Sequence, residues 1–454
     1  MTISVIIPVY NAAAHLQLCL GHLRNSTVAP LECLVVDDGS TDETATVARE
    51  AGARVINVPS RRGPAFARNL GASEARGDIL FFLDADVCVR PDAIARLLAN
   101  FRQDPDLDAV VGSYDDSPAP TGLLSQYRNL MHSHVHQRAP RNTATFWSGC
   151  GAIRRLVFLA HEGFDASYSR PAIEDIELGY RLARANCKLA IDNQLLVKHL
   201  KHWTFWKLIK TDVLDRGVPW TELILRDGSM PNHLNIDVSE RISVALAFIL
   251  FGLAAEGTIR YRGYFLTPFL AVLVFLLAKY WVDATSRPRS RAITAAMTLL
   301  IASFSWLSWH YHMIKMVPPV LLGYVILFVQ HRYTYGRTSA LMGKIYGIYV
   351  FFVLIFALAF LPARPVVFIV YLVLLGLVVI NKQFYVFLST RLGGFSALAV
   401  LPFHFLYHFY NGISFLIGLS RHIGKGLFQG THRGSRSFPA SESSQRARQY
   451  VDRS

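Results

Sequence analysis

The second half of the chain consists of long apolar runs, and they restrict the possible folds more than any other feature. From Ile242 onward these runs are separated by short basic loops, whereas residues 1–235 carry charged side chains throughout. Of the 454 residues, 52% are hydrophobic and only 17% are charged, which is too apolar for a purely soluble protein of this size. The pattern predicts an α/β domain at 1–235, an all-α transmembrane domain at 236–428 and a disordered basic tail at 429–454.

Six apolar segments approach the length needed to cross about 30 Å of hydrocarbon. They are residues 242–259, 264–284, 292–310, 314–331, 345–361 and 366–381. A seventh stretch at 396–419, rich in His, Tyr and Phe, fits either a span or a helix that lies in the membrane interface. Basic loops at 285–291 and 331–344 obey the positive-inside rule if the first domain is cytoplasmic. We therefore expect a multi-pass protein of the inner (cell) membrane with its N-terminal domain in the cytoplasm.

The net charge of +14 could serve either nucleic-acid binding or contact with a membrane. Many basic residues adjoin the apolar runs, as Arg260, Arg287 and Arg332 do, and the sequence contains no recognisable nucleic-acid module. This placement indicates topogenic charge and contact with membrane lipids, and no nucleic-acid partner. The five cysteines lie in the first half and form no CxxC pair, which favours a reducing compartment.

The first 90 residues alternate between apolar runs and helical stretches. Four apolar runs are predicted as strands: residues 3–9, 31–38, 53–58 and 78–86. Strands separated by helices of this length form parallel sheets that are covered by helices. Because ligands of such sheets bind beyond the carboxyl ends of the strands, the acids Asp37–Asp38 and Asp84–Asp86 are expected to face one crevice.

Asp84 and Asp86 follow the apolar run ILFFL with a single alanine between them. Two carboxylates that flank a small residue at a strand end form a compact set of hard oxygen ligands. Such a set suits Mg²⁺ or Mn²⁺, which can bridge a diphosphate. The alternative is a solvated strand end, and a D-x-D sequence alone does not decide between the two.

Four segments in sequence order carry a resemblance to a known family. They are VIIPVYN at 5–11, VVDDGSTDET at 35–44, the stretch 63–86 that ends in LDAD, and EDIELGYRL at 174–182. Together they resemble the family 2 glycosyltransferases, whose catalytic domain has the GT-A fold, and the resemblance covers about residues 1–215. It implies an N-terminal α/β GT-A domain, a nucleotide-sugar donor, expected to be a UDP-sugar, and Mg²⁺ or Mn²⁺ as cofactor.

The resemblance also implies which residues bind the donor and the metal. The expected donor contacts are Pro8, Tyr10, Asp37, Asp38, Arg68, Asn69 and Asp84. Within this set, Asp37 and Asp38 receive the base and the ribose, which fits the ability of carboxylates to accept from N–H and hydroxyl groups. Asp86 is the expected direct metal ligand, with Asp84 beside it. His199 is a candidate third contact to the metal or the diphosphate.

The acid pair Glu174–Asp175 begins a predicted helix, where acids also suit the helix dipole. By the resemblance, Asp175 is the general base that deprotonates the acceptor hydroxyl, and Glu174 orients its surroundings. A single base on the face opposite the leaving group implies inversion at the sugar carbon. Trp147, Gly149 and Glu174 are expected on the acceptor side.

Two departures from the family pattern bear on the function. HEGFD at 161–165 stands where GGFDE is more usual, which leaves the local acceptor contacts open. The stretch DRGVPW, with Arg216 and Trp220, stands where processive members carry Q-x-x-R-W. The expected function is therefore membrane-bound transfer of one sugar to a lipid-linked or glycan acceptor, with envelope polysaccharide or glycolipid synthesis as its setting. The alternatives are a processive polysaccharide synthase coupled to export and an inactive membrane scaffold or transport protein.

Overall fold

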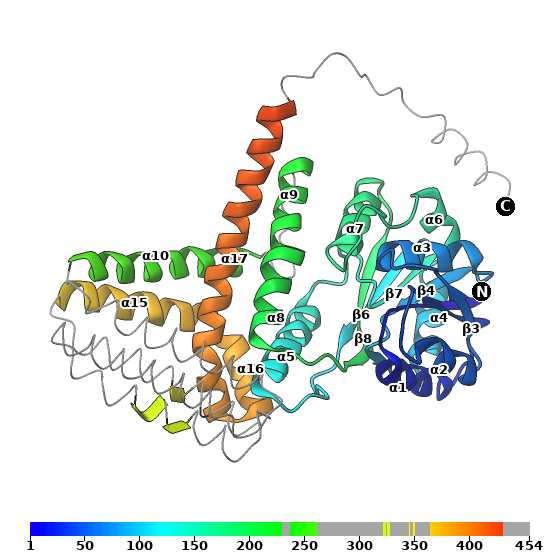
Figure 1. Cartoon of the computed structure of the whole chain (residues 1–454), viewed down its shortest axis with the longest axis horizontal. Coiled ribbons are helices and arrows are strands. Elements are labelled where there is room, and N and C mark those ends of the chain that lie inside the picture. Colours follow the sequence, from blue (N-terminus) through cyan, green and yellow to red (C-terminus); the bar gives the residue numbers. More distant parts are fainter. Residues whose placement is uncertain are drawn as a thin grey trace.

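The computed structural model describes residues 1–228, 237–260, 321–323, 325–326, 345, 348–349 and 364–429. An α/β domain occupies the N-terminal part, and several long helices stand beside it (Figure 1). The predicted domain boundary at 235, the spans at 264–284 and 292–310 and the tail from 430 lie outside the described residues. Most of the spans at 314–331 and 345–361 lie outside them too.

The α/β domain is built around one mixed sheet of eight strands, in the order β3-β2-β1-β4-β7-β6-β8-β5. The strands are β1 (Ile3–Val9), β2 (Glu32–Asp37), β3 (Arg54–Asn57), β4 (Ile79–Leu83), β5 (Val87–Val89), β6 (Ala109–Tyr114), β7 (Cys150–Arg154) and β8 (Leu189–His199). The first four are mutually parallel, as predicted, and β6 is parallel to β8. Strand β7 runs antiparallel between β4 and β6, and β5 antiparallel to β8. This mixed, mostly parallel sheet supports the expected α/β GT-A domain.

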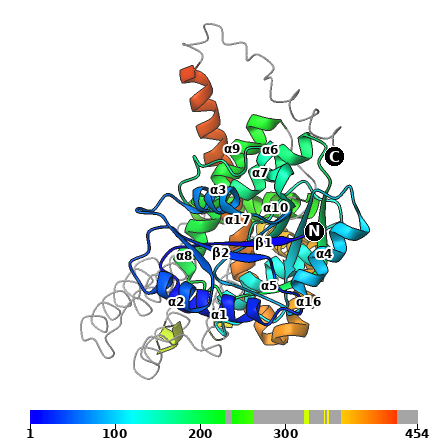
Figure 2. The same ribbon diagram turned by 90° about the vertical axis from the view of Figure 1, so that its right-hand side faces the viewer.

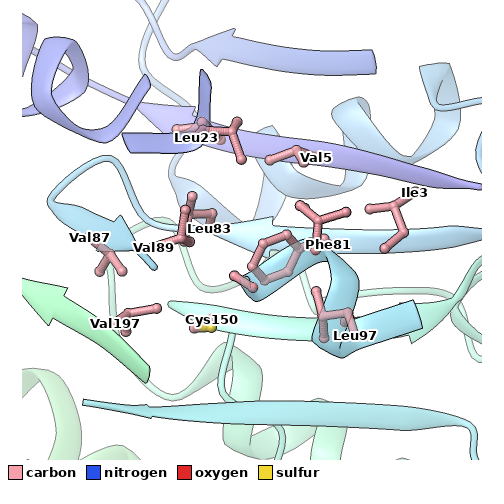
Figure 3. Close-up of a cluster of buried hydrophobic side chains, with 14 of the residues drawn as sticks. Ile3, Val5, Leu23, Phe81, Leu83, Val87, Val89, Leu97, Cys150 and Val197 are labelled. Atoms are coloured by element: carbon pink, nitrogen blue, oxygen red, sulfur yellow. The ribbon is translucent and has the colours of Figure 1, made fainter. Parts of the chain in front are cut away.

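Helices cover both faces of the sheet (Figures 1 and 2). One face carries α1 (Ala13–Arg24), α2 (Thr44–Glu50) and α4 (Ala93–Gln103), and the other carries α3 (Pro64–Glu74), α6 (Arg155–Ala160) and α7 (Glu174–Arg184). Because side chains alternate along a strand, β4 sends Phe81 and Leu83 into the first layer and Phe82 into the second. Figure 3 shows Phe81 and Leu83 in the first layer, with Leu23 of α1 and Leu97 of α4.

The remaining described helices follow the α/β domain or pack against it. They are α5 (Leu123–Arg138), α8 (Phe205–Lys210), the π-helix η1 (Thr211–Gly217), α9 (Val218–Asp227), α10 (Val238–Arg260), α15 (Arg364–Ile380), α16 (Lys382–Leu392) and α17 (Gly394–Gln429). Helix α17 passes along α9, and α10 lies beside α15 (Figure 1). A buried ion pair joins Arg128 Nη2 of α5 to Asp212 Oδ1 of η1 at 2.5 Å. Tyr410 of α17 donates its hydroxyl hydrogen to Asp212 Oδ2 at 2.7 Å, so one carboxylate links three elements.

Within the described residues, no single helix is long and apolar enough to cross a membrane. Leu372–Ile380 and Lys382–Leu392 form a pair bent by 69° whose joint length and composition would allow a crossing. The expected spans at 242–259 and 366–381 fall in α10 and α15, and the stretch 396–419 falls in α17. These segments are helical as predicted, and their position in a membrane stays a prediction.

Gly179 provides a test of how tightly α7 is held against the sheet domain. A β-carbon at this position would overlap the backbone nitrogen of Phe146, so Gly179→Ala has to push α7 away from that segment. We expect a loss of about 1–3 kcal/mol in the free energy of unfolding, measured by denaturant titration of the full chain.

Gly21→Ala is the matched control for this prediction. Gly21 lies in α1, and no atom lies within 4 Å of the added β-carbon. It should raise the free energy of unfolding by about 0.5–1 kcal/mol because alanine has the higher helix propensity. Equal effects of the two substitutions would contradict the close packing of α7.

Candidate active site

The two acid pairs that follow β2 and β4 share one edge of the sheet. Strand β1 lies between these strands and is parallel to both, so their carboxyl ends point the same way. Asp37 and Asp38 stand at the end of β2, and Asp84 and Asp86 follow β4 directly. The sheet therefore brings the two acid pairs to one side, as the sequence predicted.

Asp38 is buried and already holds a neighbouring loop. Its Oδ1 accepts the backbone N–H of Arg62 and its Oδ2 accepts that of Gly63, each at 2.8 Å. Gly63 has a φ of 99°, which favours glycine, and it begins α3. Asp37 Oδ1 accepts the N–H of Ser40 at 2.9 Å. Both acids thus shape the loops around the strand ends, and their expected contacts with a base and a ribose stay predictions.

Tyr10 and Pro8 lie at the carboxyl end of β1. Tyr10 is exposed, and the Arg61 guanidinium lies 4.2 Å from the centre of its ring. Pro8 is half-buried beside Val36 of β2. An aromatic ring with a stacked cation at a strand end provides a flat surface for a base and a positive charge for a phosphate.

Arg68 joins two acid motifs that lie 90 positions apart in the sequence. From α3, its Nη2 donates to Asp84 Oδ1 at 2.7 Å and its Nη1 donates to Glu174 Oε1 at 2.8 Å. Glu174 and Arg68 are both buried, and Glu174 Oε2 also accepts the N–H of Ala172. This buried cation holds the start of α7 against the end of β4.

Asn69, the next residue, has a structural contact. Its amide both donates to the carbonyl of Phe164 at 2.7 Å and accepts that residue's N–H at 2.9 Å. This pair of bonds fixes the loop that precedes α7. The expected contact between Asn69 and the nucleotide stays a prediction.

Asp175 lies at the start of α7 and is half-buried. Its Oδ2 accepts both the N–H and the hydroxyl of Ser148 at 3.1 Å. Burial, together with the charge of Glu174, raises the pKa of Asp175 to about 6, although Arg68 acts in the opposite direction. A carboxyl group with a pKa near 6 can take a proton near neutral pH more readily than an ordinary aspartate.

Asp86 and His199 form the part of the site that suits a metal. Asp86 Oδ2 lies 3.6 Å from His199 Nε2, and His199 Nδ1 lies 2.9 Å from Asn129 Oδ1. Asn129 also accepts from Trp203 Nε1 and donates to the carbonyl of Lys201, so its oxygen faces His199 and receives the Nδ1 proton. Nε2 is the ring nitrogen that lies toward the Asp86 carboxylate.

The unprotonated Nε2 and the carboxylate would both act as ligands of a cation bound between them. The partners Asn129 and His199 match the usual arrangement in which an outer hydrogen bond fixes the tautomer of a metal-binding histidine. Burial alone would raise the pKa of Asp86, but the attraction of His199 and Lys201 holds it below its ordinary value. Among the described residues, no three His, Cys, Asp or Glu side chains converge as a complete metal site. Asp86 and His199 would supply two ligands to a divalent cation, and a diphosphate and water would supply the others.

Trp147 and Gly149 lie beside Asp84 and Asp175. Gly149 accepts the N–H of Asp84 at 3.2 Å, and a β-carbon there would clash with the Trp147 indole, so only glycine fits. Trp147 packs against Tyr114, with ring centres 4.5 Å apart, and Tyr114 stacks on His199 at 4.6 Å. This aromatic group connects the expected acceptor side to the metal side.

Several residues of the site were missed in the sequence. Tyr114 ends β6 and Asn129 lies in α5, and neither belongs to a recognisable motif. Lys201 follows β8, and burial lowers its pKa even though Asp86 lies nearby. The only available signal was position, because Lys201 follows the candidate ligand His199 by two residues.

The bridge formed by Arg68 yields a stability prediction. Arg68→Met leaves Glu174 buried without its cation, so we expect a loss of about 3–5 kcal/mol in the free energy of unfolding of the full chain. Adding Glu174→Gln should restore part of this loss because it removes the uncompensated charge. Arg102→Met, at an exposed position of α4, should change stability by less than about 0.5 kcal/mol. An equal loss in the single and double variants would show that the charge of Glu174 is not the cause.

The N-terminal part of the chain is similar to known proteins. Residues 4–160 match the sequence model of the family described as "Glycosyl transferase family 2". Glycosyltransferase GlyG of Streptococcus pneumoniae is 33% identical over 117 residues, which are 25% of this chain and 38% of that protein. The O-antigen chain rhamnosyltransferase RfbN of Salmonella typhimurium is 27% identical over 243 residues, 49% of this chain and 75% of that protein.

A solved structure is similar over a larger share of the chain. The mannosyltransferase PcManGT from Pyrobaculum calidifontis, in complex with GDP-Man and Mn²⁺, has a TM-score of 0.41 and 19% identity, and the alignment covers 71% of this chain and 86% of that one. The chain spans 31% of the 4,4'-diaponeurosporenoate glycosyltransferase of Staphylococcus haemolyticus, with 37% identity over 136 residues, and less than half of GlyG. The named glycosyltransferases among these relatives support a glycosyltransferase enzyme. Residues 4–160 therefore carry a domain of glycosyl transferase family 2.

Proposed function

We propose that the chain is a metal-dependent inverting glycosyltransferase. It takes a sugar from a nucleotide-sugar donor, a UDP-sugar, and transfers it to a lipid-linked or glycan acceptor at the inner membrane. The catalytic domain lies in the cytoplasm in this proposal. The long apolar runs and basic loops of the second half support a membrane location.

One observation carries the proposal: Arg68 brings the acids after β4 and the acids of α7 into one site. Asp84 and Glu174 are 90 positions apart, yet both accept from the same guanidinium. Asp175 follows Glu174 directly and Asp86 lies two residues after Asp84. A base and a candidate metal ligand are thus held on two sides of the same buried cation.

This arrangement supports a single displacement. The acceptor hydroxyl attacks the anomeric carbon while Asp175 takes its proton, a new C–O bond forms, and the bond to the diphosphate breaks with inversion. Asp86 and His199 would hold the Mg²⁺ or Mn²⁺ that offsets the charge of the departing diphosphate. Ser148 orients the Asp175 carboxylate through its N–H and hydroxyl. Trp147 provides an apolar face on which a sugar ring can rest.

The experiment that tests the function is a donor panel in native-like membranes. Release of nucleotide and transfer of sugar are measured for a set of nucleotide sugars, with Mn²⁺ or Mg²⁺, for the wild type and for Asp175→Asn. We expect metal-dependent turnover of one donor and a fall of about 10²–10⁴-fold in kcat for transfer in the variant. Asp106→Asn, on an exposed loop, is the control. No turnover of any donor with membrane lipids present would overturn the proposal.

The pH dependence provides a second prediction. Asp175 must be ionised to accept a proton, and its pKa is raised to about 6. The value of kcat/KM for transfer should therefore rise tenfold per pH unit below about pH 6 and level off above it. Arg68→Lys should weaken the charge contact with Asp175. The pKa of Asp175 and the midpoint of the pH profile should then rise, because Arg68 lowers that pKa. A flat profile from pH 5 to pH 8 would exclude Asp175 as the base.

Metal binding can be tested without turnover. Electron paramagnetic resonance of Mn²⁺ titrated into the full chain with a nucleoside diphosphate should show a bound fraction. We expect Asp86→Asn and His199→Gln to weaken Mn²⁺ binding more than tenfold, since each removes a candidate ligand. Glu50→Gln, an exposed carboxylate in α2, should leave the binding unchanged. Equal Mn²⁺ affinity in all variants would place the metal elsewhere.

A further inference from the structure

A second cavity lies outside the donor site, between α9 and η1 on one side and α10 and α17 on the other. Its volume is about 470 Å³, within the usual range of ligand sites. Its walls are largely apolar, with Ile224, Val244, Phe248, Phe415 and Leu416 among the lining residues. Asp84, Asp86 and Asp175 do not line it, so it is separate from the donor site.

The charges at the cavity are not all balanced. Arg128 is paired with Asp212, and Glu240 faces His408, with 3.4 Å between Oε2 and Nδ1. Arg216 lines the same cavity, and within the described part of the chain no ion pair or hydrogen bond engages its guanidinium. Arg216 is half-buried in η1, so this cation is partly removed from water without a fixed anion. An anionic ligand group would compensate it.

The cavity adjoins the helix that carries the proposed base. Trp220, a lining residue, donates from Nε1 to the Tyr180 hydroxyl of α7 at 2.9 Å. Trp220 also packs in one apolar cluster with Ile173 and Ile176, the residues on either side of Glu174–Asp175. The Arg216 charge acts on Asp175 as well, in the direction that favours its ionised form. The cavity therefore adjoins the start of α7, which carries the proposed base.

We propose that this cavity binds the acceptor, and that the acceptor is a lipid phosphate or diphosphate. Its P–OH is the attacking hydroxyl: the oxygen bonds to the anomeric carbon, the proton goes to Asp175, and the bond from that carbon to the nucleoside diphosphate breaks. Its anionic group lies against Arg216, and its hydrocarbon chain lies between α10 and α17, along Val244 and Phe248. This inference rests on the proposed glycosyl transfer and names the substrate class of that reaction. The hydrocarbon walls offer few hydrogen-bond partners to a glycan, which is why a lipid is the better occupant.

The helices around the cavity are arranged to leave such a chain room. Near the cavity, Gly217 of η1 lies directly against Ser414 of α17, and Gly418 of α17 lies against Thr221 of α9. These two glycines let α17 cross η1 and α9 at close range. The cavity lies beside this crossing, and Val244 and Phe248 of α10 line its remaining side.

Photocrosslinking locates the acceptor directly. A prenyl phosphate that carries a diazirine on its chain is irradiated with the wild-type full chain, and the labelled peptides are identified by mass spectrometry. We expect labels in α9, α10 and α17, and competition by farnesyl phosphate but not by farnesol or inorganic phosphate at the same concentration. Labels confined to other segments, or equal competition by farnesol, would overturn the proposal.

Two substitutions and a matched control give a kinetic test. Val244→Trp fills the cavity and Arg216→Gln removes its unpaired cation, so each should raise the KM for the lipid phosphate at least tenfold and leave the KM for the donor unchanged. Ile249→Trp, on the exposed side of α10, adds the same ring outside the cavity and should change neither. Unchanged acceptor KM in both cavity variants would overturn the inference.

Hydrolysis of the donor by water, measured without acceptor, separates the two proposals. If the wild type hydrolyses the donor and the cavity variants transfer the sugar as well as the wild type, the glycosyltransferase proposal stands and the acceptor site is overturned. Absence of hydrolysis and transfer in the wild type overturns the proposed function itself, whatever the crosslinks show.

Discussion

The buried guanidinium of Arg68 is the interaction on which the site depends. It lies between Asp84, at the end of a central strand, and Glu174, at the start of a helix on the face of the sheet. A buried cation is stable only with hydrogen-bonded anions, and each of these acids is held in turn by the same cation. The ion pairs therefore fix the distance between two chain segments that are covalently far apart. Asp86 and Asp175 lie next to these acids in the chain, so the ion pairs also fix the positions of the proposed metal ligand and the proposed base.

A second buried charge group connects the α/β domain to the C-terminal helices. Asp212 accepts from Arg128 of α5 and from Tyr410 of α17, so it has a partner on each side. The same η1 turn presents Arg216 to the cavity beside α17. π-Helical turns often occur at functional sites because they displace one side chain from the regular helical path. The contact between the two parts of the chain and the proposed acceptor site thus arise from one short segment.

The sequence predicted the elements around the donor side well, because their signals are local. Apolar runs at 3–9 and 78–86 became β1 and β4, and the acid helix began at Glu174 as expected. The sequence did not predict that the side-chain amide of Asn69 donates to the Phe164 carbonyl. Nor did it predict that both carboxylate oxygens of Asp38 accept backbone N–H groups of a loop. A side chain's partner in a distant loop leaves no periodic pattern. For the same reason Tyr114 and Asn129, which organise His199, could not be recognised.

The sequence by itself determined the alternation of strands and helices, the acids at the strand ends and the apolar character of the second half. These follow from side-chain chemistry and short-range periodicity, which act over a few residues. Only the tertiary structure decided that Arg68 joins residues 84 and 174 and that Nε2 of His199 lies toward Asp86. It also decided that Arg216 lines a cavity with no ion pair to its guanidinium among the described residues. Burial, which makes each of these contacts strong, exists only once distant segments have packed and excluded water.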